Sequence, residues 1–325
     1  MAMKAFVRSG YGGPEALELR EVETPTPGAG EVLVRVRASS VNAADLDYLY
    51  GRPAMTRLGT GLREPRWKRL GLDVAGVVEE VGSDVSRFAA GDEVFGDLTV
   101  CGYGAFAEYA IATEKALAPK PKGLSFEEAA TVPQSAILAI QALHSWRPVR
   151  EGEEVLVNGA SGNVGPFAVG IAQAYGCRVT GVCSTAKIDF VRSLGVADII
   201  DYTTDDYAES GRRWDRIVDV AAHRSILASR RALKPGGVYA WAGGDTRSLL
   251  GAMSIGPVLS LLTSRKSGLF MWKPFKAEDV AELTRLIEAG KLRPVIDRSF
   301  GLEQVPEALR YLDEKRAKGK LVITV

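Results

Sequence analysis

Residues 154–176 hold the pattern that most restricts the fold of this chain. A short apolar run, Glu154–Asn158, ends in a turn with glycine at every third position, and the turn opens directly into a helical pattern. A strand, a glycine turn and a helix in that order bring backbone N–H groups and a helix N-terminus up to a diphosphate. The pattern therefore predicts a dinucleotide-binding turn, with contacts from Gly159, Ser161, Gly162, Asn163, Val164 and Gly165.

The residues after the turn predict a helix with one buried face. Apolar residues recur at the spacing of one helix side, namely Val164, Phe167, Ala168, Ile171 and Tyr175. Pro166 falls in the first turn of this helix, where its missing N–H costs little, and Gly176 is placed to cap the end. A strand, turn and helix that bind no ligand remain the alternative.

The end of the next predicted strand, residues 179–183, bears on the choice of cofactor. Sites for NAD usually carry Asp or Glu at this point, which binds the ribose 2′-hydroxyl. Here Ser184, Thr185 and Lys187 follow the strand, and the first carboxylate is Asp189. Hydroxyls and a cation suit a 2′-phosphate, which an acid would repel. We therefore expect NADPH rather than NADH, bound through Ser184 and Lys187, although helix capping and a solvated lysine are alternatives.

Length and charge limit the class of protein. A chain of 325 residues is expected to form two domains. A net charge of +1 gives no basic surface for nucleic acid. The first residues lack the apolar core of a signal peptide, and three cysteines are too few for a disulfide framework. These features predict a cytoplasmic protein.

One segment, Ser248 to Ser264, carries no charge. It is interrupted by Gly251, Gly256 and Pro257, and it is shorter than the ~20 apolar residues that a spanning helix needs. We expect a lid, a subunit contact or a pocket segment here, with peripheral membrane contact as the alternative and no membrane span.

The chain changes character twice. The first third predicts strands near 31–37, 74–81, 92–95 and 106–111. From about Ser125 to Phe275, strands and helices alternate as in a doubly wound parallel sheet. The last fifty residues return to mixed character, with helices near 278–289 and 305–312 and strands near 295–300 and 321–325.

Several phrases spread over the whole length resemble the medium-chain dehydrogenase/reductase superfamily, in its zinc-free quinone oxidoreductase (zeta-crystallin-like) branch. The phrases are 74–78 (VAGVV), 91–96 (GDEVFG), 104–109 (GAFAEY), 158–165 (NGASGNVG), 290–298 (GKLRPVIDR) and 319–323 (GKLVI). The resemblance implies an α/β protein with a GroES-like substrate domain (1–125 and 276–325) and an inserted Rossmann domain (126–275). It also implies a nicotinamide bound between the domains and a homodimer.

The resemblance also bears on metal. Zinc-containing relatives carry a cysteine where this chain has Asn42, and their Gly-His-Glu segment is replaced by residues 71–73 (GLD). His144 and His223 lie far from both positions in the sequence. Because a catalytic zinc needs about three protein ligands in a small volume, we expect no metal site. Asp45 and Asp73 pairing around another ion is a minor alternative.

Without a Lewis acid, the expected hydride acceptors are already electron-poor: quinones and α,β-unsaturated carbonyl compounds. Asn42 and Tyr48 are the candidate catalytic residues, as donors to the substrate oxygen. By resemblance, Tyr202 packs near the adenosine phosphate, while Gly243 and Gly244 let the nicotinamide approach the backbone.

Three departures from the family pattern bear on this prediction. Leu138 replaces a threonine near the nicotinamide, Ala221 replaces a glycine after the fourth Rossmann strand, and the basic-aromatic segment 63–69 alters the substrate mouth. The alternative is therefore an NADPH-binding structural or regulatory protein with little turnover.

Overall fold

The computed structural model describes residues 1–270 and 272–325 and divides into two compact units. The terminal unit contains residues 1–134, 274–280 and 294–325, and the inserted unit contains residues 135–273 and 281–293. One unit is thus built from both ends of the chain, and the other is inserted between them. The first boundary, however, lies at residue 134 rather than 125.

Residues 281–293 form part of the inserted unit, although the sequence analysis assigned them to the other domain. Their side chains explain the difference. Glu282 accepts a hydrogen bond from the Tyr175 hydroxyl at 2.6 Å. The Leu292 side chain packs closely against Gly170, since a Cβ built on that glycine would lie only 2.9 Å from Leu292 Cδ1. Both contacts attach the segment to the helix that follows the glycine turn.

The inserted unit is built on one parallel six-stranded sheet in the order β10-β9-β8-β11-β12-β13. The strands are β8 (Glu154–Asn158), β9 (Arg178–Cys183), β10 (Asp198–Asp201), β11 (Trp214–Asp219), β12 (Leu233–Trp241) and β13 (Lys266–Leu269). The chain runs outward from β8 to β10 and then returns to β11 on the other side of β8. Ligands of such sheets bind beyond the carboxyl ends of the strands where the order reverses. That point lies between β8 and β11, where the glycine turn begins.

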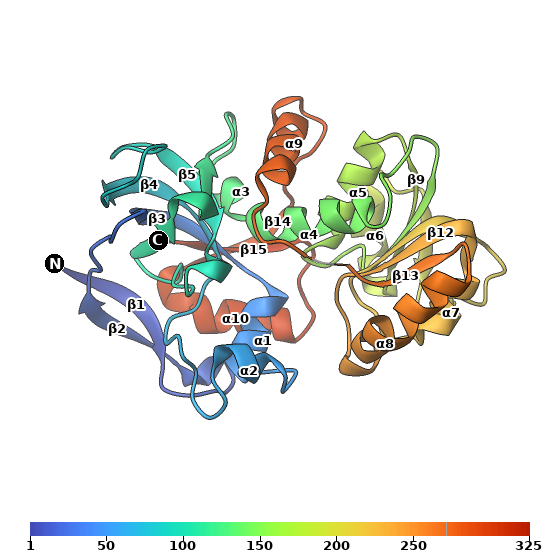
Figure 1. Cartoon of the computed structure of the whole chain (residues 1–325), viewed down its shortest axis with the longest axis horizontal. Coiled ribbons are helices and arrows are strands. Elements are labelled where there is room, and N and C mark those ends of the chain that lie inside the picture. The colour runs from blue at the N-terminus through green and yellow to red at the C-terminus, as the bar shows by residue number, and fades with distance from the viewer. Residues whose placement is uncertain (271) are drawn as a thin grey trace. The chain divides into compact units, whose positions relative to one another are not determined.

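Helices cover both faces of this sheet (Figure 1). They are α5 (Gly165–Ala174), α6 (Ile188–Ser193), α7 (Ile226–Arg231) and α8 (Thr246–Leu262). Two further helices, α4 (Pro133–His144) and α9 (Ala277–Glu288), each begin in the terminal unit and continue into the inserted one. The helix predicted after the glycine turn is confirmed as α5. Gly176 follows its end at φ +75°, and its N–H donates to the Gln173 carbonyl at 2.9 Å.

Two stretches of the inserted unit differ from the sequence expectation. Residues 234–237 (KPGG), whose proline and glycines are typical of a helix end, lie beyond α7, which ends at Arg231, and are taken into β12 after Leu233 pairs with Trp214. The uncharged stretch forms α8 and continues to β13, an edge strand that the sequence analysis did not predict.

Helix α8 leaves apolar side chains exposed, including Leu250, Val258, Leu261 and Leu262. Among the described residues, no helix is both long enough and apolar enough to cross a membrane. The roles expected for this segment, a lid, subunit contact or peripheral membrane contact, stay predictions.

The terminal unit contains a seven-stranded sheet in the order β14-β15-β3-β4-β5-β7, with β6 paired to β3, and a separate β1–β2 hairpin. The strands are β1 (Ala2–Arg8), β2 (Leu17–Glu23), β3 (Glu31–Val41), β4 (Asp73–Val81), β5 (Glu93–Asp97), β6 (Tyr109–Thr113), β7 (Leu117–Pro119), β14 (Ile296–Gly301) and β15 (Lys320–Thr324). Valines 32, 34 and 36 of β3 are buried on one face, as their alternation predicts.

The helices of the terminal unit are short. They are α1 (Ala43–Tyr50), α2 (Thr56–Thr60), α3 (Phe126–Ala130) and α10 (Val305–Asp313). Helices α1 and α10 pack into a core with Phe106, Leu321 and Ile323. This core holds the start of α1 against the starts of β4 and β15.

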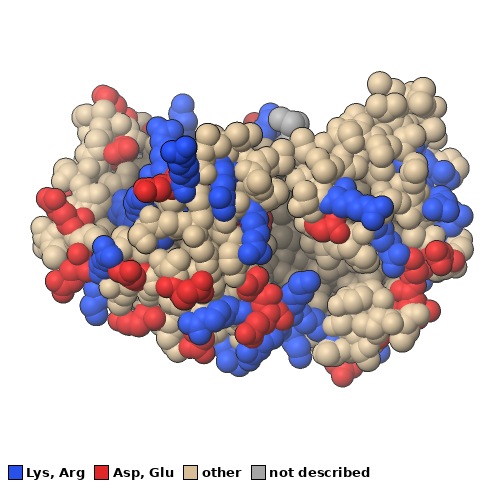
Figure 2. Space-filling view, turned by 90° about the horizontal axis from the view of Figure 1, so that it is seen from below, with Lys and Arg blue, Asp and Glu red and all other residues tan. Residues whose placement is uncertain are grey.

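Charged side chains of both signs are interspersed over the face shown in Figure 2. Neither sign gathers there into one continuous region. This distribution matches a chain with 41 basic and 40 acidic residues.

Candidate active site

The predicted cofactor turn lies at the reversal point of the parallel sheet. Strand β8 is buried, and the turn that follows it hydrogen-bonds to its neighbour, because Gly159 N and Ala160 N donate to the Val182 carbonyl of β9 at 3.1 and 3.0 Å. Ser161 is buried, whereas Gly162, Asn163 and Val164 are partly exposed. The structure therefore brings the predicted turn residues together at the N-terminus of α5, a helix end that favours anions.

The three glycines of the turn are required for different reasons. Gly159 has φ +84°, and a Cβ there would lie 2.8 Å from Val220 Cγ2. A Cβ on Gly165 would lie 2.3 Å from the Gly159 carbonyl oxygen, inside the turn itself. On Gly162 the nearest atom would be 3.6 Å away, an ordinary contact. Contacts within the protein therefore exclude a side chain at Gly159 and Gly165. At Gly162 they do not, and the space beside it is open to a ligand.

A buried carboxylate connects the strand ends beneath this turn. Asp219 Oδ1 accepts from Asn158 Nδ2 at 2.7 Å, and Oδ2 accepts from the Tyr239 hydroxyl at 3.0 Å. Burial raises the pKa of Asp219 to about 6, although the hydrogen bonds from Asn158 and Tyr239 oppose the rise. Asp219 therefore ties together the carboxyl ends of β8, β11 and β12. Asp219 was not among the predicted site residues, although its place as an acid at the end of an apolar strand could have indicated it.

The residues predicted to bind the adenosine 2′ position gather after β9 and β10. Ser184 and Lys187 are half-buried and flank a single 3₁₀ turn, in which Lys187 N donates to the Ser184 carbonyl at 2.9 Å. The Tyr202 N–H donates to the Cys183 carbonyl at 3.0 Å, and the Tyr202 side chain is exposed. The strand ends therefore bring all three residues close together in the backbone.

The same strand ends bring in an acid that the sequence analysis missed. Asp201 Oδ2 accepts from the Thr185 hydroxyl at 2.5 Å, and Oδ1 accepts from Thr203 N at 2.9 Å. These hydrogen bonds hold the pKa of Asp201 below its ordinary value. No carboxylate follows β9 directly in the sequence, but the neighbouring strand β10 supplies one beside Thr185. The parallel pairing of β9 and β10 places the ends of both strands together, and it is the feature from which the proximity of Asp201 to Thr185 could have been predicted.

Gly243 and Gly244 follow β12, as expected. A Cβ on Gly244 would lie 2.2 Å from the Ala222 carbonyl oxygen, and one on Gly243 would lie 3.1 Å from the Val220 carbonyl oxygen. The close approach that requires glycine here is therefore made by the protein backbone. Approach of a nicotinamide to these residues stays a prediction.

The predicted catalytic residues lie in the terminal unit at α1. Asn42 occupies the N-cap position, and its N–H donates to Asp45 Oδ2 at 2.9 Å. Its side chain does not cap the helix but turns into the interior, where Nδ2 donates to Asp73 Oδ2 at 2.9 Å and Oδ1 accepts from Lys320 Nζ at 2.5 Å. With Asn42 only 1% exposed, this geometry favours a positioning role over the predicted donation to substrate.

The buried acids around Asn42 have unusual protonation. Burial raises the pKa of Asp45 to about 8 and that of Asp97 to about 7. Asp45 Oδ1 and Asp97 Oδ2 are buried and accept no hydrogen bond from the described residues. The Asp73–Lys320 pair lies among these acids, with Nζ 3.4 Å from Oδ2, and burial lowers the pKa of Lys320 while the neighbouring carboxylates raise it.

Tyr48 lies on α1 beside a second tyrosine that the sequence analysis missed. The Tyr48 and Tyr103 ring centroids are 4.8 Å apart, and the ring planes are tilted by 37°. Burial raises the pKa of both phenols. Tyr103 has φ +67°, a strained conformation for a bulky residue.

The cluster at Asn42 does not fit zinc. Zinc sites use thiolate, imidazole or carboxylate ligands, and here an amide and one carboxylate already bind an ammonium group. Within residues 1–270 and 272–325, no three His, Cys, Asp or Glu side chains are arranged to hold a metal ion. His144 instead packs edge-on against the Tyr175 ring, and His223 Nδ1 lies 3.2 Å from the Ala221 carbonyl.

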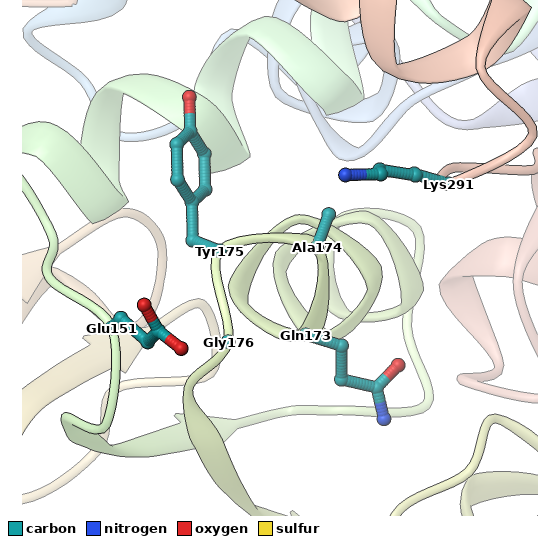
Figure 3. A pocket seen from close by; sticks show the side chains of 6 residues that line it. All are labelled: Glu151, Gln173, Ala174, Tyr175, Gly176 and Lys291. Atoms are coloured by element: carbon teal, nitrogen blue, oxygen red, sulfur yellow. The ribbon is translucent and has the colours of Figure 1, made fainter.

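A surface pocket of about 740 Å³ lies elsewhere in the inserted unit (Figure 3). It is lined by Glu151, Gln173, Ala174, Tyr175, Gly176 and Lys291. These residues surround the C-terminal end of α5, whereas the glycine turn lies at its N-terminal end. A ten-residue helix is about 15 Å long, so this pocket is not the diphosphate site.

Comparison with known proteins agrees with this architecture. The sequence profile described as "Alcohol dehydrogenase GroES-like domain" matches residues 28–122, and the one described as "Zinc-binding dehydrogenase" matches residues 194–323. The chain is 32% identical to "Chloroplast envelope quinone oxidoreductase homolog" of Arabidopsis thaliana, covering 99% of this chain and 98% of the relative. It is also 32% identical to "2-methylene-furan-3-one reductase" of Solanum lycopersicum, covering 99% and 79% respectively.

Among solved structures, the quinone oxidoreductase from Coxiella burnetii superimposes with a TM-score of 0.88 at 28% identity, over the full length of both chains. A GroES-like unit and a parallel sheet with a glycine turn at its reversal point define a nicotinamide-dependent oxidoreductase. The chain belongs to the medium-chain dehydrogenase/reductase superfamily, in its quinone oxidoreductase-like branch.

Proposed function

We propose that this oxidoreductase transfers hydride from NADPH, without zinc, to a quinone or to the C=C bond of an α,β-unsaturated carbonyl compound. The observation that carries the proposal is the Asn42–Asp73–Lys320 cluster, whose donor set does not suit zinc. A protein that positions two reactants without a Lewis acid is restricted to acceptors that are already electrophilic.

Relatives with both chemistries in their names support this acceptor class. The Arabidopsis and Coxiella proteins are named as quinone oxidoreductases, and the tomato protein is named as the reductase of a methylene-furanone. Both names describe a carbonyl conjugated to C=C. Hydride added to the β-carbon moves an electron pair onto the carbonyl oxygen, and a proton must then be supplied to the resulting enolate.

Tyr48 is the proposed donor to that oxygen. It is half-buried, burial raises its pKa further above the neutral range, and its ring packs against that of Tyr103. A neutral hydroxyl that hydrogen-bonds to a developing oxyanion stabilises the transition state more than the ground state.

NADPH is proposed over NADH because Lys187 and Ser184 follow β9 and no acid follows that strand directly. Asp201 opposes this preference with a negative charge beside Thr185. Both of its oxygens, however, already accept hydrogen bonds from threonines. We propose that Lys187 decides the balance. The cytoplasmic location and the homodimer also remain proposals.

The test is rapid-mixing measurement of NADPH oxidation with a small naphthoquinone and, separately, with a cyclic enone. We expect oxidation by at least one acceptor, and weaker binding of NADH than of NADPH in fluorescence titrations. Tight NADPH binding without oxidation by either acceptor would favour the alternative, a cofactor-binding protein with little turnover.

A further inference from the structure

Lys320 is buried at the centre of the Asn42 cluster. It begins β15, its side chain is 1% exposed, and its Nζ donates to Asn42 Oδ1 at 2.5 Å and to Asp73 Oδ2 at 3.4 Å. A lysine ammonium is almost never fully buried unless it is paired. The position of this one therefore requires the acceptors around it.

Asp73 connects the ammonium to several elements. Its Oδ2 also accepts from the Ser40 hydroxyl at 2.5 Å and from Asn42 Nδ2, and its Oδ1 accepts from Gln134 N at 3.0 Å. Ser40 lies in β3, Asn42 at the start of α1 and Gln134 in the first turn of α4. One carboxylate thus fixes the ends of β3 and the starts of α1, β4 and α4.

Two of the segments in this cluster lie where zinc-containing relatives carry their metal ligands. Asn42 and residues 71–73 replace the zinc-ligand phrases of zinc-containing relatives, and in this fold they converge on the Lys320 ammonium. A bound cation joins the side chains that ligate it into one rigid group. Here a side chain supplies that positive charge, and a metal ion beside it would meet electrostatic repulsion.

We propose that Lys320 is a positioning residue whose ammonium acts as a built-in cation: it holds Asn42 and Asp73 together and so sets the start of α1, the helix that carries Tyr48. Its catalytic consequence rests on the proposed function, but its role as an internal cation does not. Lys320 acts through Asn42 and the placement of α1, and it touches no reacting atom.

The first test separates charge from packing. Lys320→Met keeps most of the side-chain volume and leaves Asp73 buried without its cation, so we expect Tm to fall by roughly 10 °C. Lys320→Met combined with Asp73→Asn removes both charges and is expected to recover at least half of that loss. Lys318→Ala, at an exposed lysine two residues away, is the matched control and should leave Tm unchanged.

The second test restores the cation. Lys320→Ala leaves a cavity, which methylammonium can enter, whereas tetramethylammonium has no N–H to donate. Thermal unfolding of Lys320→Ala should therefore recover in methylammonium chloride and not in tetramethylammonium chloride of equal concentration. Lys320→Met, with the cavity filled, should respond to neither salt.

Activity supplies the third readout. Both Lys320 variants should bind NADPH as the wild type does, because the glycine turn lies in the other unit, while kcat falls by ~10-fold through misplacement of α1. If Lys320→Met unfolds at the wild-type Tm, or if the double variant is no more stable than Lys320→Met, the proposal is wrong. If the wild type oxidises no NADPH, the proposed function fails, yet the two unfolding tests still decide the role of Lys320.

Discussion

The glycine turn allows a prediction that separates folding from cofactor binding. Gly162→Ala and Gly165→Ala add the same methyl group three residues apart. At Gly165 the new carbon would lie 2.3 Å from the Gly159 carbonyl oxygen and 2.5 Å from the Ala160 carbonyl carbon. Both are backbone atoms, so the turn must shift by roughly 1 Å, and overpacking of this kind costs ~1–3 kcal/mol. At Gly162 the nearest atom is 3.6 Å away, and φ lies outside the left-handed range.

Gly165→Ala should therefore lower the free energy of unfolding by ~3 kcal/mol, the upper end of that range, because no flexible side chain can yield. Gly162→Ala should remain within ~1 kcal/mol of the wild type. Under the proposed assignment of this turn to the diphosphate, the methyl group of Gly162→Ala instead lies on the side open to the ligand. We expect NADPH binding to weaken by ~10–100-fold, the equivalent of one or two lost hydrogen bonds.

Urea unfolding followed by tryptophan fluorescence gives the stabilities, and fluorescence titration gives the NADPH affinities. The informative result is the crossed pattern, in which one variant loses stability and the other loses affinity. Wild-type NADPH affinity in a folded Gly162→Ala variant would refute the assignment of this turn to the diphosphate. Wild-type stability of Gly165→Ala would refute the packing argument.

Three further predictions concern single side chains. Lys187→Ala should weaken NADPH binding by ~10-fold and leave NADH binding unchanged in parallel titrations, the loss expected for one charge-assisted hydrogen bond; equal losses for both cofactors would contradict it. Asp45 has a pKa raised from 3.8 to about 8 by burial, so folding retains a proton that the unfolded chain releases, and stability should fall as pH rises from 4 to 8. Asp45→Asn should remove part of that slope, measured as urea midpoints across the range, and an unchanged slope would show that Asp45 is ionised. Tyr48→Phe should lower kcat by ~10–100-fold with NADPH affinity unchanged, and unaltered kcat would exclude Tyr48 as the donor.

Local sequence patterns predicted the cofactor turn well because its requirements are local. The spacing of glycines, the apolar strand before them and the helix face after them all lie within residues 154–176, and each appears in the structure as expected. The absence of a carboxylate directly after β9 could be read in the same way.

Residues brought together by strand pairing were missed for the opposite reason. Asp201 reaches Thr185 only because β10 pairs with β9, and Lys320 reaches Asn42 across 278 positions in the sequence. A lysine at the start of a terminal strand has no local signal of burial. Likewise, the φ of Tyr103 and its contact with Tyr48 come from the packing of the terminal unit.

The extent of the helix before Val238 could not be read from composition. Residues 234–237 contain proline and two glycines, which normally end a helix and begin a turn. In the structure they lie between two paired parts of β12, because Leu233 pairs with Trp214 and Val238 pairs with Arg216. Gly236 has φ +73°, so the chain turns locally as its composition favours, and strand pairing resumes on the same partner strand.

Rapid-mixing NADPH oxidation by protein treated with a chelator, with zinc content measured on the same sample, tests the central claim most directly. We predict that the naphthoquinone or the enone is reduced at the untreated rate by protein that contains far less than one zinc per chain. A rate that disappears on chelation and returns on addition of zinc would contradict this account.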